Sequence, residues 1–392
     1  MSSNPSRAPH GRTIRDSSGY AAFVPAPLPP PIAWDRALVA DLSAADRAIG
    51  RLAGEGRRLR NPHLFIKPFV HREAVLSSRI EGTRTTLGEL LVAAAGGNTG
   101  RASADLEEVA NYVAALEHGL ERLSSLPLSL RLIRELHEHL MRGVRGDTAL
   151  PGEFRHSQNW IGPPGCSLSE AMYVPPPPAE LMACLDPFER FLHDDSLPPL
   201  VHAGLAHAQF EAIHPFLDGN GRVGRLLITL LLVERAVLPS PLLYLSAYFE
   251  ATREMYYAHL LAVTRQGAWE RWLSYFLRGV KIQAEDAVER MDQIDGLLED
   301  WREELAGVQL GRPREVLRLF AENPFWTVKG VAEELGVAYT TAQRAVERLQ
   351  VAGIVSPVGS AKRNRVYCSR DMLAVLEAPR AAARSLPEAT PP

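Results

Sequence analysis

Apolar residues recur at helical spacing through most of the chain between residues 35 and 284. Gly- and Pro-rich turns divide this part, and the pattern predicts helices over 35–52, 104–123, 128–144, 180–193 and 200–213. Residues 222–235 are apolar nearly all round, which indicates a helix inside a core. Residues 159–174 have apolar ends around a Gly, Pro and Ser centre and predict a β-hairpin flap. We therefore expect a mainly α fold.

The pattern changes in the C-terminal part of the chain. Residues 283–310 form a charged amphipathic stretch, which predicts a helix that bridges two domains. Three short helices follow at 313–322, 328–335 and 340–352, and two short strands at 354–358 and 364–368. That order predicts a winged helix-turn-helix domain.

These changes predict six segments along the chain. Residues 1–24 are polar and predict a disordered N-terminus, and 378–392 predict a disordered tail. Between them we expect an N-terminal helical region at 25–105, a helical core at 106–285, a helical linker at 286–312 and the winged helix at 313–377. The first of these opens with a Pro-rich strap at 25–31.

Composition narrows the class of protein. The chain has 392 residues, 46% hydrophobic and 23% charged, which is typical of a soluble globular protein. A net charge of −3 excludes the whole molecule as an electrostatic nucleic-acid binder. Three dispersed cysteines without a CxxC pair indicate neither a disulfide framework nor a zinc site. No stretch has the length of a signal peptide core or a membrane span, so we expect a cytoplasmic protein without a membrane partner.

The most informative stretch is HPFLDGNGRVGR at residues 214–225. The turn directly before the buried helix consists of Gly219, Asn220 and Gly221. A helix N-terminus presents unpaired N–H groups and a positive dipole end. Two arginines in the first turn, Arg222 and Arg225, oppose that dipole unless a polyanion binds there, and a triphosphate fits.

Two further side chains flank this anion site. A neutral His214 can take a proton from an attacking hydroxyl, and Asp218 suits a Mg²⁺ ion that bridges phosphates. The side chain of Asn220 can donate to a phosphate oxygen. The chain contains no P-loop, and Thr229 occupies the position at which an EF-hand needs Glu. We infer phosphoryl or nucleotidyl transfer.

Residues 214–225 resemble the signature HPFx[DE]GN[GK]RxxR of the Fic family, and the resemblance covers roughly 25–284. It implies a Fic-type helical core that moves AMP from ATP to a Ser, Thr or Tyr hydroxyl of a protein, with Mg²⁺ at Asp218 and His214 as general base. Arg225 would hold the γ-phosphate. The other implied nucleotide contacts are Gly219, Asn220, Gly221, Arg222, Gly224 and, for adenine, Tyr257. The flap would align the target main chain as an added strand through Ile161, Gly162, Tyr173 and Val174.

A second motif of this family lies upstream. Residues 77–82, SSRIEG, resemble the inhibitory pattern [ST]xxxE[GN], with Ser77, Glu81 and Gly82 at its defined positions. The resemblance implies that Glu81 pairs with Arg225 and restrains the enzyme in cis. A carboxylate there would occupy the γ-phosphate site.

Alternatives remain open at this point. The chain can be a DNA-binding regulator whose Fic domain only senses nucleotide, because residues 340–365 carry basic side chains on the recognition helix and wing. It can also be a Fic enzyme that removes AMP or uses another nucleotide donor. Winged helices also bind proteins, and a homodimer is a further expectation from the family. The basic residues are Arg344, Arg348, Lys362, Arg363 and Arg365.

Overall fold

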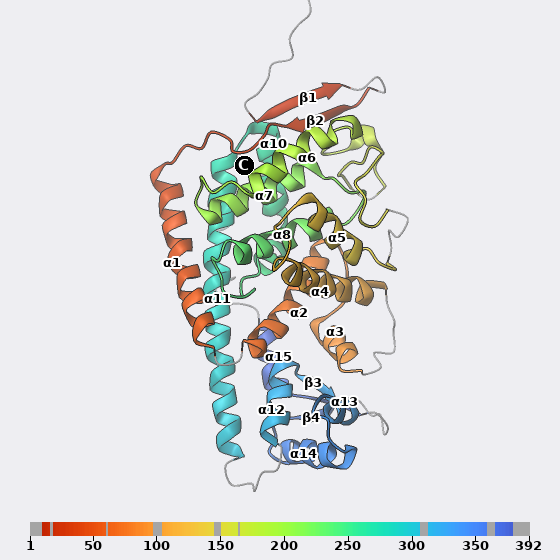
Figure 1. The fold of residues 1–392 in the computed structure, drawn as a ribbon, viewed down its shortest axis with the longest axis vertical. Coiled ribbons are helices and arrows are strands. Elements are labelled where there is room, and N and C mark those ends of the chain that lie inside the picture. Colours follow the sequence, from red (N-terminus) through yellow and green to blue (C-terminus); the bar gives the residue numbers. More distant parts are fainter. Residues whose placement is uncertain are drawn as a thin grey trace, which may run out of the picture.

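A computed structural model describes residues 10–15, 19–59, 62–96, 104–144, 150–163, 165–305, 313–358 and 365–378. The fold is mainly helical, as predicted (Figure 1). Helix α8 (Asn220–Glu234) lies in the core, and every residue from Arg222 to Leu232 is buried. Helices α4 (Ala104–Arg122), α5 (Leu130–Leu140) and α7 (Pro199–Ile213) pack against it. Three helices complete this region: α6 (Pro178–Leu192), α9 (Ser246–Ala251) and α10 (Arg253–Gln266).

Two long helices lie side by side along the outside of the core (Figure 1). These are α1 (Arg36–Arg58) and α11 (Trp269–Glu304). The predicted linker at 286–312 therefore begins inside α11 rather than after it. The reason is that Ile294, Leu298 and Trp301 continue the buried face of α11 at helical spacing.

The N-terminus corrects one prediction. Within residues 1–24, which were expected to be disordered, two strands pair antiparallel: β1 (Gly11–Arg15) and β2 (Ala21–Pro25). Ala22 and Val24 are buried, and the Phe23 N–H donates to the Val174 carbonyl at 2.9 Å. These long-range contacts order a segment that has no strong pattern of its own. Residues 1–9 and 16–18, and the predicted tail from 379 onward, lie outside the described residues.

The flap is smaller than the predicted hairpin. It consists of one antiparallel bridge between Ile161 and Tyr173, with a 3₁₀ turn at Leu168–Glu170 between them. Pro163 lacks an N–H group and Glu170 caps the turn at Ser167, so the ladder does not extend.

The C-terminal module has the predicted helices and strands in the predicted order. They are α12 (Pro313–Glu322), α13 (Val328–Glu334), α14 (Tyr339–Val351), β4 (Ser356–Val358) and β5 (Val366–Cys368). Two elements were not predicted: β3 (Phe325–Thr327), which makes the sheet order β3-β5-β4, and α15 (Arg370–Glu377). Arg344 and Arg348 are exposed on α14, and the wing tip at 359–364 lies outside the described residues. Winged-helix identity and DNA binding stay predictions.

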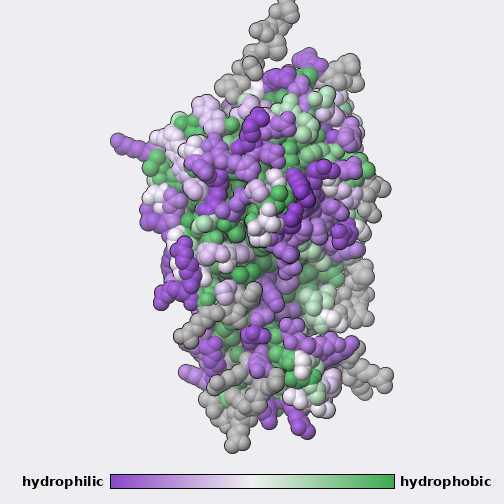
Figure 2. Space-filling model, in the orientation of Figure 1, coloured by the Kyte–Doolittle hydropathy of each residue, from purple (hydrophilic) through white to green (hydrophobic). Residues whose placement is uncertain are grey.

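Helix α2 (His63–Ile80) and helix α3 (Leu87–Ala94) connect this module to the core. Hydrophilic and hydrophobic residues are interspersed on the face of the molecule in Figure 2. Among the described residues, no helix combines the length and apolarity that crossing a membrane requires.

Candidate active site

The loop between α7 and α8 carries the signature and reverses the chain within a few residues. His214 ends α7 in the left-handed region, with φ 49° and ψ 61°, and Gly219 precedes α8 with φ 76°. A Cβ on Gly219 would lie 2.9 Å from the sulfur of Met141, so this turn requires glycine.

Asn220 braces this loop. Its Oδ1 accepts from the Phe216 N–H and its Nδ2 donates to the Phe216 carbonyl, both at 2.8 Å. Asn159 donates to the same carbonyl at 2.8 Å. The Asn220 amide is thus buried and bonded inside the loop, and its contact with a phosphate stays a prediction. The unpaired backbone N–H groups at the start of α8 are what this position offers an anion.

His137 on α5 packs against the loop between α7 and α8 and holds it in place. Its ring stacks on Phe216 at a centroid distance of 3.8 Å. Nδ1 accepts from the Gly152 N–H at 2.9 Å, so Nε2 carries the proton and donates to the Asp218 carbonyl at 3.1 Å. Burial lowers the pKa of His137 to about 4, which keeps this neutral tautomer at neutral pH.

His214 is held in place through its backbone. Its carbonyl accepts from Arg155 Nε at 2.9 Å and from Asn159 Nδ2 at 3.4 Å, which orients the residue. Burial, with the nearby Arg155 charge, lowers the pKa of His214 to about 4. The imidazole is therefore neutral near pH 7 and can accept a proton.

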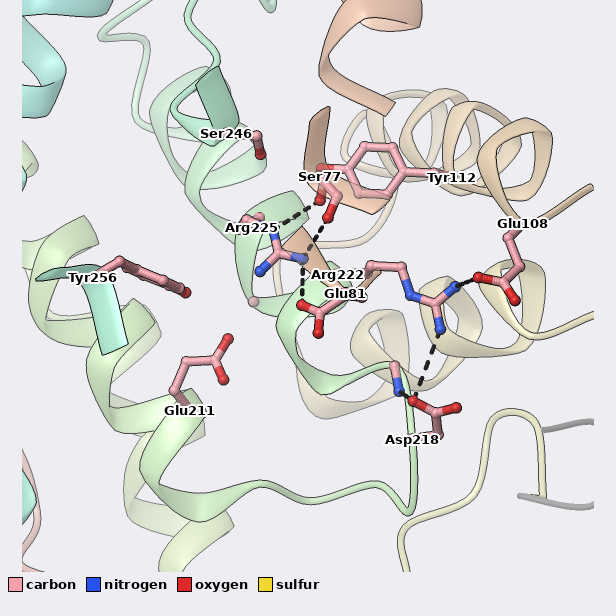
Figure 3. A network of polar contacts seen from close by, with 12 residues as sticks. Ser77, Glu81, Glu108, Tyr112, Glu211, Asp218, Arg222, Arg225, Ser246 and Tyr256 are labelled. Atoms are coloured by element: carbon pink, nitrogen blue, oxygen red, sulfur yellow. Dashed lines mark hydrogen bonds and ion pairs between the residues drawn. The ribbon is translucent and has the colours of Figure 1, made fainter. Parts of the chain in front are cut away.

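Arg225 makes the pair that the inhibitory motif implies (Figure 3). Its Nη2 donates to Glu81 Oε1 at 2.7 Å, and Ser77 accepts from Nε at 2.8 Å and from Nη2 at 3.0 Å. The predicted contact between Glu81 and Arg225 is thus present. Gly82 has φ 104°, which ends α2 directly after the glutamate. A Cβ on Gly221 would lie 2.3 Å from Glu81 Oε1, so the missing side chain makes room for the carboxylate.

Arg222 and Arg225 point to different helices (Figure 3). Arg222 turns toward α4, where Nη1 lies 3.3 Å from Glu108 Oε2, and its Nη2 lies 3.9 Å from Asp218 Oδ1. The residue is 3% exposed. Arg222 is therefore neutralised in part by its own protein, and of the two it is Arg225 that faces α2.

Asp218 has the exposure that a metal ligand needs. Its side chain is 57% exposed, and its Oδ1 accepts from the Gly219 N–H at 2.6 Å. Among the described residues, no group of three or more His, Cys, Asp or Glu side chains could hold a metal. A hard oxygen ligand beside an anion site fits Mg²⁺, which takes few protein ligands and completes its shell with phosphate and water.

Two predicted nucleotide contacts lie in different surroundings. Gly224 faces α7, where its carbonyl accepts from His207 at 2.9 Å and a Cβ would lie 2.8 Å from Glu211 Oε1. Its contact with a phosphate stays a prediction. Tyr257 is 39% exposed, and burial together with the Glu81 charge raises its pKa to about 12. Its ring contacts that of Tyr256 at a centroid distance of 5.2 Å, and Tyr257 stays a candidate for the adenine contact.

The flap residues divide in the same way. Tyr173 points inward, and its hydroxyl donates to the Ala212 carbonyl at 2.6 Å. The Val174 carbonyl is taken by β2, so these two do not offer the free edge that we expected. Ile161 is 36% exposed and stays a docking candidate. Gly162 is required by packing, because a Cβ there would lie 2.5 Å from Cys166 Sγ.

Sequence reasoning missed a buried carboxyl behind Ser77. Glu73 accepts from Tyr112 at 3.1 Å and from the Ser246 N–H at 3.2 Å. Burial raises the pKa of Glu73 to about 7. The sequence does contain a pattern that points to Glu73, because Glu73, Ser77 and Glu81 follow one another at four-residue spacing and so share one face of a helix.

The chain matches known families over the region that holds this site. Residues 39–121 match the Fic/DOC family N-terminal model, and residues 127–232 match the Fic/DOC family model. The chain belongs to the Fic/DOC family. The protein adenylyltransferase Fic of Drosophila virilis is 36% identical over 148 residues, which are 37% of this chain and 27% of that protein. Its counterpart in Drosophila ananassae is 34% identical over 148 residues, 37% of this chain and 26% of that protein.

Solved structures show the same fold. A Fic family protein from Desulfovibrio desulfuricans G20 aligns with a TM-score of 0.58 and 21% identity, over 87% of this chain and 98% of that one. Fic-1 from C. elegans, residues 134–508, aligns with a TM-score of 0.50 and 21% identity, over 65% of this chain and 74% of that one. The chain spans about a quarter of the length of the curated relatives that it matches.

Proposed function

We propose that this Fic protein is a protein adenylyltransferase, a nucleotidyltransferase that moves AMP from ATP to a Ser, Thr or Tyr hydroxyl of a protein. The observation that carries the proposal is the position of His214, whose side chain is 16% exposed, in the short loop that leads into the N-terminus of α8. A base next to an anion site is what transfer of a phosphorus group to a hydroxyl needs. The name of the Drosophila relatives supports the same reaction.

The chemistry proceeds by direct displacement. The Nε2 atom of His214 accepts the proton of the target hydroxyl, and that oxygen forms a bond to the α-phosphorus of ATP. The bond from the α-phosphorus to the oxygen bridging to the β-phosphate breaks, and pyrophosphate leaves with the electron pair. Arg155 and Asn159 hold the His214 backbone in place before substrate arrives, so the base needs no reorganisation.

Phosphates would bind at the start of α8. Backbone N–H groups there point at the anion, and Arg225 supplies a charge for the γ-phosphate. Asp218 would hold Mg²⁺, which when bound neutralises phosphate charge. ATP is therefore the substrate and Mg²⁺ the cofactor of the proposal.

Inhibition by Glu81 follows from the bonds of Arg225. Glu81 competes with the γ-phosphate for the same guanidinium, while Ser77 holds Arg225 on its other side. Loss of Glu81 therefore frees positive charge without releasing the arginine. We expect ATP to bind productively only when Glu81 withdraws.

The test uses ATP labelled at the α-phosphate, with Mg²⁺ and purified candidate targets or lysate proteins. Four proteins are compared: wild type, Glu81→Ala, Glu81→Ala with His214→Ala, and Glu299→Ala, a matched control at an exposed position of α11. We expect covalent label to rise in Glu81→Ala alone and to vanish in the double variant. Label transferred from a parallel sample of γ-labelled ATP but not from α-labelled ATP, or no label in any protein, would reject AMP transfer.

A further inference from the structure

Glu211 lies one turn before His214 at the end of α7. Its Oε2 is 4.0 Å from Nδ1 of His214. Its Oε1 and the Nδ1 atom of His214 are both buried, and neither has a hydrogen-bond partner among the described residues. Two buried polar atoms without partners are costly, so their proximity needs an explanation.

Figure 3 shows the Glu211 side chain between Tyr256 and the pair of Arg225 and Glu81, pointing into the site. Gly224 provides the space, because a Cβ there would lie 2.8 Å from Glu211 Oε1. The Glu211 carboxyl therefore has room between α7 and α8.

We propose that Glu211 is a positioning residue that accepts the Nδ1–H of His214 when the site is loaded. This keeps the proton on Nδ1 and leaves Nε2 free to receive the proton of the target hydroxyl. The proposal rests on the proposed AMP transfer. In it, Glu211, which lies outside the signature, makes His214 basic enough to take the proton of the target hydroxyl.

The charges around the pair support this role. Burial and the Arg155 charge lower the pKa of His214 to about 4, which alone makes a weak base. An adjacent carboxylate stabilises the imidazolium that forms during transfer. Burial raises the pKa of Glu211 to about 7, with Arg225 lowering it and Glu81 raising it. The Glu211 backbone carbonyl and the Glu81 and Asp218 charges raise the pKa of His214. Because only ionised Glu211 can stabilise the imidazolium, activity should increase as the pH rises through about 7.

The kinetic test compares Glu211→Gln with a matched Glu299→Gln, both in the Glu81→Ala background. We expect Glu211→Gln to lower kcat by about tenfold or more with KM for ATP within about twofold, and to remove the rise of activity with pH. Glu299→Gln should match its parent. An unchanged kcat and pH profile in Glu211→Gln, or a change in KM alone, would overturn the positioning role. Absence of label in the parent would instead reject the proposed function.

A second readout needs no turnover. Proteins labelled with ¹⁵N-histidine, and a His214→Ala variant for assignment, report the tautomer of His214 by NMR. We expect protonated Nδ1 in the presence of a non-hydrolysable ATP analogue and Mg²⁺, and mixed tautomers in Glu211→Gln. Gly224→Ala, which displaces the carboxyl, should resemble Glu211→Gln. The same tautomer in all three proteins would contradict the proposal.

A different set of contacts joins the C-terminal module to the inhibitory helix. Arg72 on α2 lies 3.6 Å from Asp286 on α11. Asp286 also accepts from Arg290 at 2.8 Å, and Arg290 donates to the Val375 carbonyl and, at 2.7 Å, to the Ala378 carbonyl at the end of α15. These groups link the three helices, because Arg72 reaches from α2 to Asp286 on α11, and Arg290 reaches from α11 to carbonyls at the end of α15.

The other side of the module contacts α2 and α3, which flank the inhibitory motif. Glu322 lies 3.3 Å from Lys67 on α2, and Asn323 donates to the Leu91 carbonyl at 3.4 Å. We infer that the C-terminal module holds α2 where Glu81 reaches Arg225. A ligand that pulls the module away would then release inhibition, which also rests on the proposed function.

The test is Arg290→Ala in full-length protein, with Lys329→Ala as an exposed control in the module. We expect more label than wild type in Arg290→Ala, and no further increase when Arg290→Ala is added to Glu81→Ala. Hydrogen exchange at residues 77–82 should speed up in Arg290→Ala without any substrate. Unchanged exchange there, or an equal increase of label in both backgrounds, would overturn the inference.

Discussion

Replacing Ser77 by alanine isolates one buried hydrogen bond of the site. Ser77 is fully buried, and its Oγ accepts from Nε of Arg225 at 2.8 Å. The neighbouring Ser78 is equally buried, but its Oγ has no partner within the part of the chain that the structure describes. The same substitution at the two positions therefore differs in the bond and little else.

The magnitude follows from the charge on Arg225. A hydrogen bond to a charged group contributes about 1.5–3 kcal/mol, and its loss leaves a buried donor without an acceptor. We expect Ser77→Ala to lower the free energy of unfolding by about 2 kcal/mol, or the melting temperature by about 4–8 °C for a cooperative unit of this size. Ser78→Ala should be neutral or stabilising, because it removes a buried hydroxyl without a partner.

Urea unfolding followed by tryptophan fluorescence measures both variants against wild type. A double-mutant cycle with Glu81→Ala then reports whether Ser77 and Glu81 act together on Arg225. Equal destabilisation by Ser77→Ala and Ser78→Ala would refute the reasoning, since volume loss rather than the hydrogen bond would explain both results.

Three further predictions concern groups around the site. Glu73→Gln should gain stability relative to wild type as the pH rises from about 4.5 to about 7. An acid whose pKa is raised by folding favours the folded state only while protonated, and urea unfolding at pH 5 and pH 8 checks this sign. Asn220→Ala should lower stability by about 1–3 kcal/mol through the lost bonds to Phe216, measured by thermal unfolding. Asn111→Ala, which removes a half-buried amide that also bonds two carbonyls, should cost less. His137→Phe keeps the stacking but loses two hydrogen bonds, so ATP affinity measured by calorimetry should fall, and unchanged affinity would show that the loop holds without it.

The sequence predicted most of the local structure around the site. The all-round apolar run at 222–235 indicated a buried helix, and α8 is buried from Arg222 to Leu232. The motif resemblance also implied the pair of Glu81 and Arg225, which the fold brings to 2.7 Å. The buried helix could be predicted because its apolar pattern lies within one short stretch of sequence. The pair of Glu81 and Arg225 could be predicted because each residue belongs to a short motif of the family.

Only the tertiary structure decided which way each helical residue faces and which residues distant in sequence contact one another. The sequence placed Gly224 and Asn220 near phosphates, but packing turns Gly224 toward α7 and uses the Asn220 amide inside the loop. The sequence pattern also did not predict strands β1 and β2, because β2 is held by a contact with the flap. The three-residue spacing of Glu211 and His214 shows that their side chains are neighbours. It does not show that Glu211 Oε1 and His214 Nδ1 lack hydrogen-bond partners among the described residues, which depends on the elements packed around them. The sequence by itself determined which chemistry is present and which faces are buried, whereas the neighbours that set the charge, orientation and availability of each group come from elements far away along the chain.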